Sequence, residues 1–178
     1  MPVKSYFRYI KLVILSLLLF PGCNPPGCSE KMQEEYPEEF AGFFHAPLKL
    51  QRLEFQKSPI ERQFKLYMYG MLRMHHPRSS FADEFVKAQG EKAIPFLTDK
   101  LKQEKDESRQ YAIIYIFEVM AECNYNITDN KELMELIRKD VSLMRYPANV
   151  DPAKEALARI IRQGIENSMI LSAPVPKK

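Results

Sequence analysis

The sequence predicts an all-α protein of about three stacked helical hairpins, which follow an export leader and a flexible tether. Apolar residues after position 58 recur at spacings of three and four, as they do on one face of a helix. Residues that start and stop helices bracket these segments. Two of the segments also repeat each other 45 residues apart. These three observations determine the predicted fold class.

The first 22 residues follow the pattern of an export signal. Lys4, Arg8 and Lys11 precede an apolar run at 12–20, and no acidic residue lies among them. A helix that spans a membrane needs roughly 17–25 apolar residues, about twice the length of this run. A secretory signal needs only about 7–15. Residues 1–22 are therefore predicted to be a signal peptide and to lie outside the folded domain.

The end of this leader, Leu19-Phe20-Pro21-Gly22-Cys23, resembles the lipobox of bacterial lipoproteins. Gly22 and Cys23 match that family, whereas Phe20 and Pro21 depart from its usual residues. The resemblance implies acyl chains such as palmitate on Cys23 and a membrane anchor in the bacterial cell envelope. Asn24 then favours the periplasmic face of the outer membrane. An ordinary cleaved signal and an uncleaved anchor remain the alternatives.

The mature chain divides by composition into four parts. Residues 23–35 are polar and rich in proline, which predicts a lipid-anchored flexible tether. Residues 36–57 form an aromatic-rich arm, either a short helix or an extended segment packed on the domain. Residues 58–171 are predicted to be the helical repeat domain, and residues 172–178 a disordered tail.

Six helices are predicted in the repeat domain from their apolar faces and capping residues. They run from Ser58-Pro59 to Pro77, from Ser80 to Gly90, through Ile94 and Leu101, from Arg109 to about Cys123, from Asp129 through Val141, and from Asp151-Pro152 through Ile165. Ser108 or Asp106 is predicted to open the fourth helix, and Ile160 and Ile165 are predicted to share the apolar face of the last. The fourth is apolar on nearly every side, which predicts a central, surrounded helix.

The internal repeat aligns residues 106–116 with residues 151–161. Residues 90–165 are similar to HEAT-type repeats, whose units recur at about 40–47 residues. The resemblance implies stacked hairpins with a long surface for binding proteins. In this alignment Ile114 and Phe117 correspond to Arg159 and Arg162. The two arginines are interpreted as the polar outer face of a terminal repeat, with binding of a carboxylate or phosphate as the alternative.

No set of residues predicts catalysis, a metal or a cofactor. The adjacent pair His75-His76 points in two directions on a helix, whereas helical metal ligands prefer a spacing of four. Cys28 and Cys123 lack metal-ligand spacing and could pair with each other, but Cys123 is expected to be buried as a small apolar residue. We therefore expect a non-catalytic protein.

The charge of the mature chain argues against nucleic-acid binding. The leader holds three of the 26 basic residues and no acid, so 23 basic residues remain against 23 acidic ones. The expected function is a lipid-anchored scaffold or inhibitor that binds another envelope or exported protein. The alternative is a small-ligand-binding protein or enzyme with a pocket between the arm and the helices.

Overall fold

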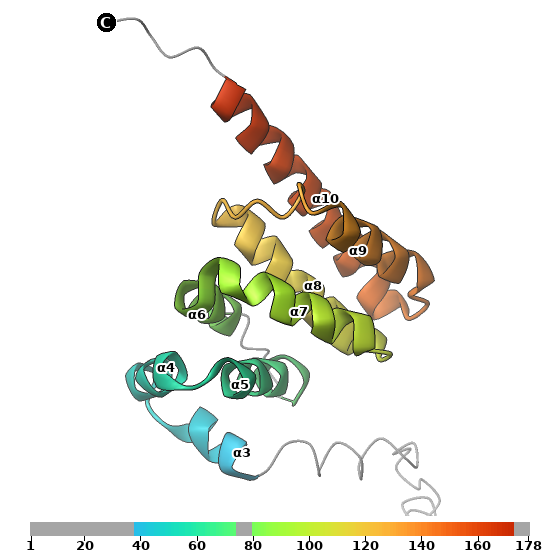
Figure 1. Ribbon diagram of the computed structural model, residues 1–178. Coiled ribbons are helices and arrows are strands. Elements are labelled where there is room, and N and C mark those ends of the chain that lie inside the picture. The colour runs from blue at the N-terminus through green and yellow to red at the C-terminus, as the bar shows by residue number, and fades with distance from the viewer. Residues whose placement is uncertain (1–37, 74–79, 173–178) are drawn as a thin grey trace, which may run out of the picture. The chain divides into compact units, whose positions relative to one another are not determined.

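The computed structural model describes residues 38–73 and 80–172, and within these ranges the chain is all-α, with no strand (Figure 1). The helices are α3 Glu38–His45, α4 Leu48–Lys57, α5 Ile60–Arg73, α6 Ser80–Gln89, α7 Ala93–Gln103, α8 Glu107–Glu122, α9 Lys131–Leu143 and α10 Pro147–Ser172, with a short 3-10 helix, η2, at Gly90–Lys92. The leader, the tether, Pro77, His75-His76 and the end of the tail lie outside the described residues.

The aromatic-rich arm is helical rather than extended, because α3 and α4 occupy residues 38–57. Its phenylalanines pack around Phe81 of α6. The ring centres of Phe43, Phe44 and Phe55 lie 5.0–5.7 Å from that of Phe81, and all four side chains are at most 5% exposed. Burial of each ring stabilises the fold by roughly 2–3 kcal/mol. The arm is therefore part of the hydrophobic core.

Buried polar side chains join the arm to the helices that follow it. Gln51 Nε2 donates to the carbonyls of Phe44 and Ala46, at 3.1 and 2.6 Å, and so fixes the turn between α3 and α4. Gln63 Nε2 donates to the carbonyl of Phe55 at 2.8 Å, across the turn from α4 to α5. A buried amide without a partner would be destabilising, so these bonds favour one arrangement of the turns.

The helix α8 is surrounded on nearly every side, as predicted. It contacts α5, α6, α7, α9 and α10. Its isoleucines and Phe117 are at most 1% exposed, whereas Tyr111 and Tyr115 are half-buried. Tyr67 of α5 reaches it as well, and its hydroxyl donates to the carbonyl of Ala112 at 2.7 Å. Burial raises the pKa of Tyr67 well above its usual value, so this hydroxyl stays protonated.

The helices α8 and α10 lie side by side and run in the same direction. Near their N-terminal ends, Asn149 Nδ2 donates to Ser108 Oγ at 3.1 Å. Farther along, Arg159 forms an ion pair with Glu118. Both pairs join residues 41 positions apart, so the two helices stay in one register. Between them lies the apolar face of α10, where Ala153, Ala156 and Ile160 are fully buried.

Three predicted helix boundaries can be compared with the structure. Asp106 caps α8 as one of the two predicted candidates, and its Oδ1 accepts from the Arg109 N–H at 3.0 Å. The prediction for α9 is wrong by one residue, because Asn130 rather than Asp129 accepts from the Leu133 N–H, at 3.1 Å. The Asp129 carboxylate instead accepts from Asn126.

The start of α10 was also predicted wrongly. The helix begins at Pro147, four residues before Asp151, and Pro152 lies inside it. Proline is well suited to the first position of a helix, where its missing N–H needs no partner. Glu107 of α8 fixes this start, because its carboxylate accepts the N–H groups of Arg145 and Tyr146 at 2.8–3.0 Å. The contact with Glu107 thus makes α10 begin at Pro147 rather than at Pro152.

Candidate binding surface

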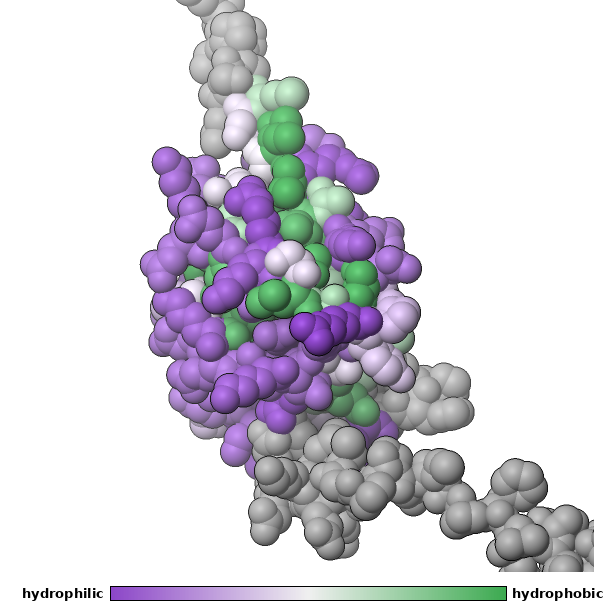
Figure 2. All heavy atoms as spheres, turned by 90° about the vertical axis from the view of Figure 1, so that its right-hand side faces the viewer, coloured by the Kyte–Doolittle hydropathy of each residue, from purple (hydrophilic) through white to green (hydrophobic). Residues whose placement is uncertain are grey.

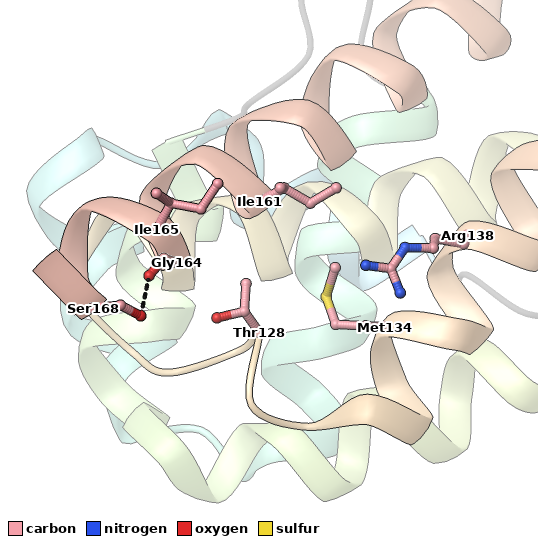
Figure 3. A pocket seen from close by; sticks show the side chains of 7 residues that line it. All are labelled: Thr128, Met134, Arg138, Ile161, Gly164, Ile165 and Ser168. Carbon is pink, nitrogen blue, oxygen red and sulfur yellow. Dashed lines mark hydrogen bonds between the residues drawn. The ribbon is translucent and has the colours of Figure 1, made fainter.

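A groove lies where α9, α10 and the loop between α8 and α9 meet (Figure 3). Its volume is about 190 Å³. Figure 3 shows Ile161 and Ile165 on the α10 side, Met134 and Arg138 on the α9 side, and Thr128 between them. The lining is mixed, with the apolar side chains of Met134, Ile161 and Ile165 beside the polar side chains of Thr128, Arg138 and Ser168. Such a lining suits a group that is partly apolar and partly polar.

Gly164 allows α10 to pass close to the loop beneath the groove. A Cβ atom at Gly164 would lie 2.3 Å from Oγ1 and 2.4 Å from Cγ2 of Thr128, closer than atoms can approach. Ile127 holds that loop in place, since its side chain is 1% exposed. Gly164 is therefore required by packing.

An apolar ridge continues along α10 beyond the groove. We call Ile161, Ile165 and Met169 the α10 ridge, because a spacing of four places them in one row on the helix surface. Ile165 is 51% exposed and Met169 64% exposed. Figure 2 shows hydrophobic residues running along this part of α10 between polar flanks. Ile165 was predicted to share the core face with Ile160, and that prediction is wrong because α10 extends past the helices that would cover it.

The two arginines predicted as a pair have different surroundings. Arg159 forms ion pairs with Glu118 of α8 and, at 2.9 Å, with Glu155 of its own helix. Arg162 is exposed, one turn of helix farther along, and forms no ion pair with any described residue. Since the carboxylates already occupy Arg159, the two side chains do not form one fork for a ligand.

Glu118 is the most buried carboxylate of the α8–α10 contact, with 3% of its surface exposed. Burial raises its pKa above the usual 4.5, and the neighbouring Arg159 opposes this shift. Its second oxygen, Oε2, has no hydrogen-bond partner. A buried carboxylate with one cation is typical of a catalytic acid, but here the pair joins two packed helices and faces no described pocket. We assign it a structural role.

The remaining predicted residues divide between the described and undescribed parts of the chain. Cys23 and Cys28 lie outside the described residues. Cys123 is exposed and free, so the prediction that it is buried is wrong. It follows the last residue of α8 at the surface, where the chain turns through Asn124 with φ of 65°. Within residues 38–73 and 80–172 no three potential metal ligands lie together, and no helix is long and apolar enough to span a membrane.

Comparisons with protein-family models, with curated proteins and with solved structures found no match to this chain.

The groove could not be predicted from the sequence, because Thr128 and Arg138 belong to separate elements with no shared pattern. Two signals were present. Ile165 and Met169 follow Ile161 at spacings of four, so the apolar row of α10 continues for two more turns of helix. A glycine within a strong helical pattern, Gly164, was a second sign of a close packing contact.

Replacing Gly164 with alanine should destabilise the protein by about 1–3 kcal/mol, since the added methyl group would overlap Thr128. This is opposite in sign to the usual effect, because alanine in a helix is favoured over glycine by roughly 1 kcal/mol. Gly42→Ala in α3 is the matched control, as open space surrounds that position. Urea unfolding measures both, and Thr128→Ala should recover part of the loss. Equal stabilisation by the two substitutions would contradict the close contact.

Removing Arg159 should cost about 2 kcal/mol at neutral pH, because it leaves the Glu118 carboxylate buried without a cation. Glu118 already has a raised pKa, so the folded state binds its proton more tightly than the unfolded state does. The stability that this group contributes is therefore complete below the usual pKa of 4.5 and decreases as the pH rises through the raised value. Arg159→Ala raises that pKa further and should extend the decrease to higher pH.

The matched background for this test is Glu118→Gln, in which the titrating group is absent. There the pH dependence from Glu118 should vanish, and Arg159→Ala should cost only a fraction of its effect in the original chain. Chemical denaturation from about pH 5 to about pH 8 covers the range of interest. An equal cost in both backgrounds would show that the ion pair does not couple α8 to α10.

Proposed function

We propose that this chain is a bacterial envelope lipoprotein, anchored through acyl chains on Cys23, whose helical domain is a non-catalytic scaffold that binds another envelope or exported protein. The apolar run at 12–20 followed by Gly22-Cys23 supports the anchor. Acyl chains contribute roughly 0.8 kcal/mol per buried methylene, so several chains on one cysteine hold a protein durably to a membrane. Asn24 favours the outer membrane and its periplasmic face.

The observation that carries the scaffold function is the parallel pairing of α8 and α10 at an offset of 41 residues, four fewer than the 45 predicted from the sequence repeat. Each of these helices also contacts the helix before it, α7 and α9 respectively. Two such hairpins with their second helices side by side are the arrangement expected of HEAT-type repeats. The fold class supports protein binding by analogy, since stacked hairpins present long surfaces.

The described polar groups favour binding over catalysis. Glu118 and Arg159 occupy each other, and Gln51 and Gln63 satisfy backbone carbonyls in turns. The aromatic arm, which would have lined the pocket of a ligand-binding protein, places its rings against one another instead. By contrast, the large exposed apolar side chains lie on outer helix surfaces, represented by Leu50, Leu53 and Ile165. Surfaces of that kind are common in protein–protein contacts.

Cys23→Ala should abolish both lipid attachment and stable membrane association in a bacterial host. Cys28→Ala is the matched control, because it removes a thiol five residues away and leaves the lipobox-like segment intact. Labelling with an alkyne fatty acid, followed by mass spectrometry of the N-terminal peptide, measures the outcome. Equal labelling of both variants, or a mature N-terminus at another residue, would contradict the anchor.

The scaffold function is tested in the same strains by recovering the protein, after cross-linking, from detergent-solubilised envelopes. We expect one other envelope or exported protein to be recovered reproducibly with the unchanged chain and with Cys28→Ala, and to be lost with Cys23→Ala. Loss in only the Cys23 variant would show that placement at the membrane matters. Recovery of no partner from cross-linked envelopes would contradict stable scaffold binding.

A further inference from the structure

We propose that two copies of this chain associate through the α10 ridge, with the two α10 helices crossing antiparallel about a twofold axis at Ile165. In this arrangement Met169 of each copy enters the groove between α9 and α10 of the other. The inference goes beyond the proposed binding of another protein, because it assigns one surface to a second copy. The outer surfaces of α4 and α7 remain available to a different partner.

The end of α10 has a physical reason to be covered. After Gly164 the helix continues for eight residues, to Ser172, beyond its close contact with the loop. Short helices that lack tertiary packing are marginal in water. The same stretch holds two of the most exposed apolar side chains of the described residues, Ile165 and Met169. An exposed apolar row is stabilised when another surface buries it.

The row is complementary to itself. In an antiparallel pair centred on Ile165, the two Ile165 side chains meet, and Ile161 of each copy faces Met169 of the other. Rows at a spacing of four interdigitate when two helices cross at about 50°. The contact is isologous, so each copy offers the same surface and the assembly closes at two chains. A head-to-tail contact would instead leave a free end on every copy.

The charges beside the row are complementary to themselves as well. Arg162 and Glu166 are exposed, lie one turn apart, and form no ion pair with any described residue. Reading the helix antiparallel about Ile165 places Arg162 within two residues of Glu166 of the second copy, about 3 Å along the axis. Two equivalent ion pairs result. A parallel pairing would instead place these residues of the two copies on opposite flanks of the contact, where they form no ion pairs.

The groove provides the matching cavity. It is lined by Met134, Ile161 and Ile165 and is open to the surface that the ridge borders (Figures 2 and 3). Methionine is unbranched and flexible, so it fills irregular apolar cavities well. Entry of Met169 would bury the apolar lining of each groove while leaving Arg138 at the rim. Each copy thus supplies one side chain and one cavity.

The test is disulfide cross-linking of the full chain in cell envelopes. Cys28 and Cys123 are first replaced with serine, so that one new thiol reports the contact. Ile165→Cys should form a dimer on a non-reducing gel, because this residue meets its own copy at the twofold axis. Lys57→Cys, exposed at the end of α4, is the control and should remain monomeric. Arg162→Glu and Glu166→Arg are then each added to the Ile165→Cys chain, alone and together.

Each single reversal should lower the cross-linked fraction about tenfold, and the double reversal should restore it, because only a self-complementary contact recovers when both signs change. No dimer from Ile165→Cys would overturn the proposal. So would a dimer of equal yield from Lys57→Cys, or a yield that no charge reversal changes. If Arg162→Glu and Glu166→Arg change the cross-linked fraction in opposite directions, the two charges do not pair across the contact, which overturns the antiparallel arrangement and leaves the scaffold function intact.

Discussion

The burial of α8 is the constraint on which the rest of the structure depends. A helix with apolar side chains around most of its circumference is stable only when other helices cover it from several directions. The surrounding helices meet this requirement, each with its own apolar stripe. Completely buried residues such as Ile113, Ile114 and Phe117 would each cost several kcal/mol to truncate. The position of every neighbour is therefore determined largely by its contact with α8.

The polar contacts of the core follow from the same constraint. A tyrosine packed against a buried helix needs an acceptor, and Tyr67 finds one in the Ala112 carbonyl. Glu118 lies where α8 meets α10, so Arg159 from the covering helix supplies its counter-charge. Such groups add little net stability compared with apolar residues of similar size. However, a shift of one helix along the other would leave them buried without partners, which is unfavourable. The register between α8 and α10 thus has both apolar and ionic determinants.

α10 is longer than the surface it covers. Its first part supplies the small residues Ala153 and Ala156, which let it approach α8 closely. Beyond Gly164 the ridge residues Ile165 and Met169 are exposed, although Ile165 and Ser168 still border the groove that α9 lines. Interaction surfaces commonly arise in this way, where an element made to cover a core extends past it. Arg162 and Glu166 flank the ridge in an order that is complementary only when the helix is reversed.

Much of the fold could be predicted from local patterns, because helical spacing and capping residues are properties of short segments. The all-α class, the surrounded fourth helix and the Asp106 cap were confirmed. The errors arose where two local signals competed and a distant contact decided between them. Glu107 selects Pro147 over Pro152 as the start of α10, and Asn130 rather than Asp129 caps α9.

The candidate binding surface was far less predictable, since it depends on which apolar residues are left uncovered. Ile165 and Cys123 were both expected in the core, and both are exposed. Their sequence environments resemble those of buried neighbours such as Ile160 and Ala121. Ile165 is exposed because α10 is longer than α9, and Cys123 is exposed because α8 ends at the surface. Those lengths are tertiary properties that apolar spacing does not encode.

Hydrogen exchange of the purified protein, followed by mass spectrometry, tests the central role of α8 most directly. If the other helices depend on α8, its amides should exchange last and only through global unfolding, while those of α3 at the edge of the fold exchange through smaller openings. The predicted order is therefore α3 first and α8 last, with the exchange free energy of α8 equal to the free energy of unfolding. Exchange of α8 as early as α3, or before its covering helices α5 and α10, would contradict this account.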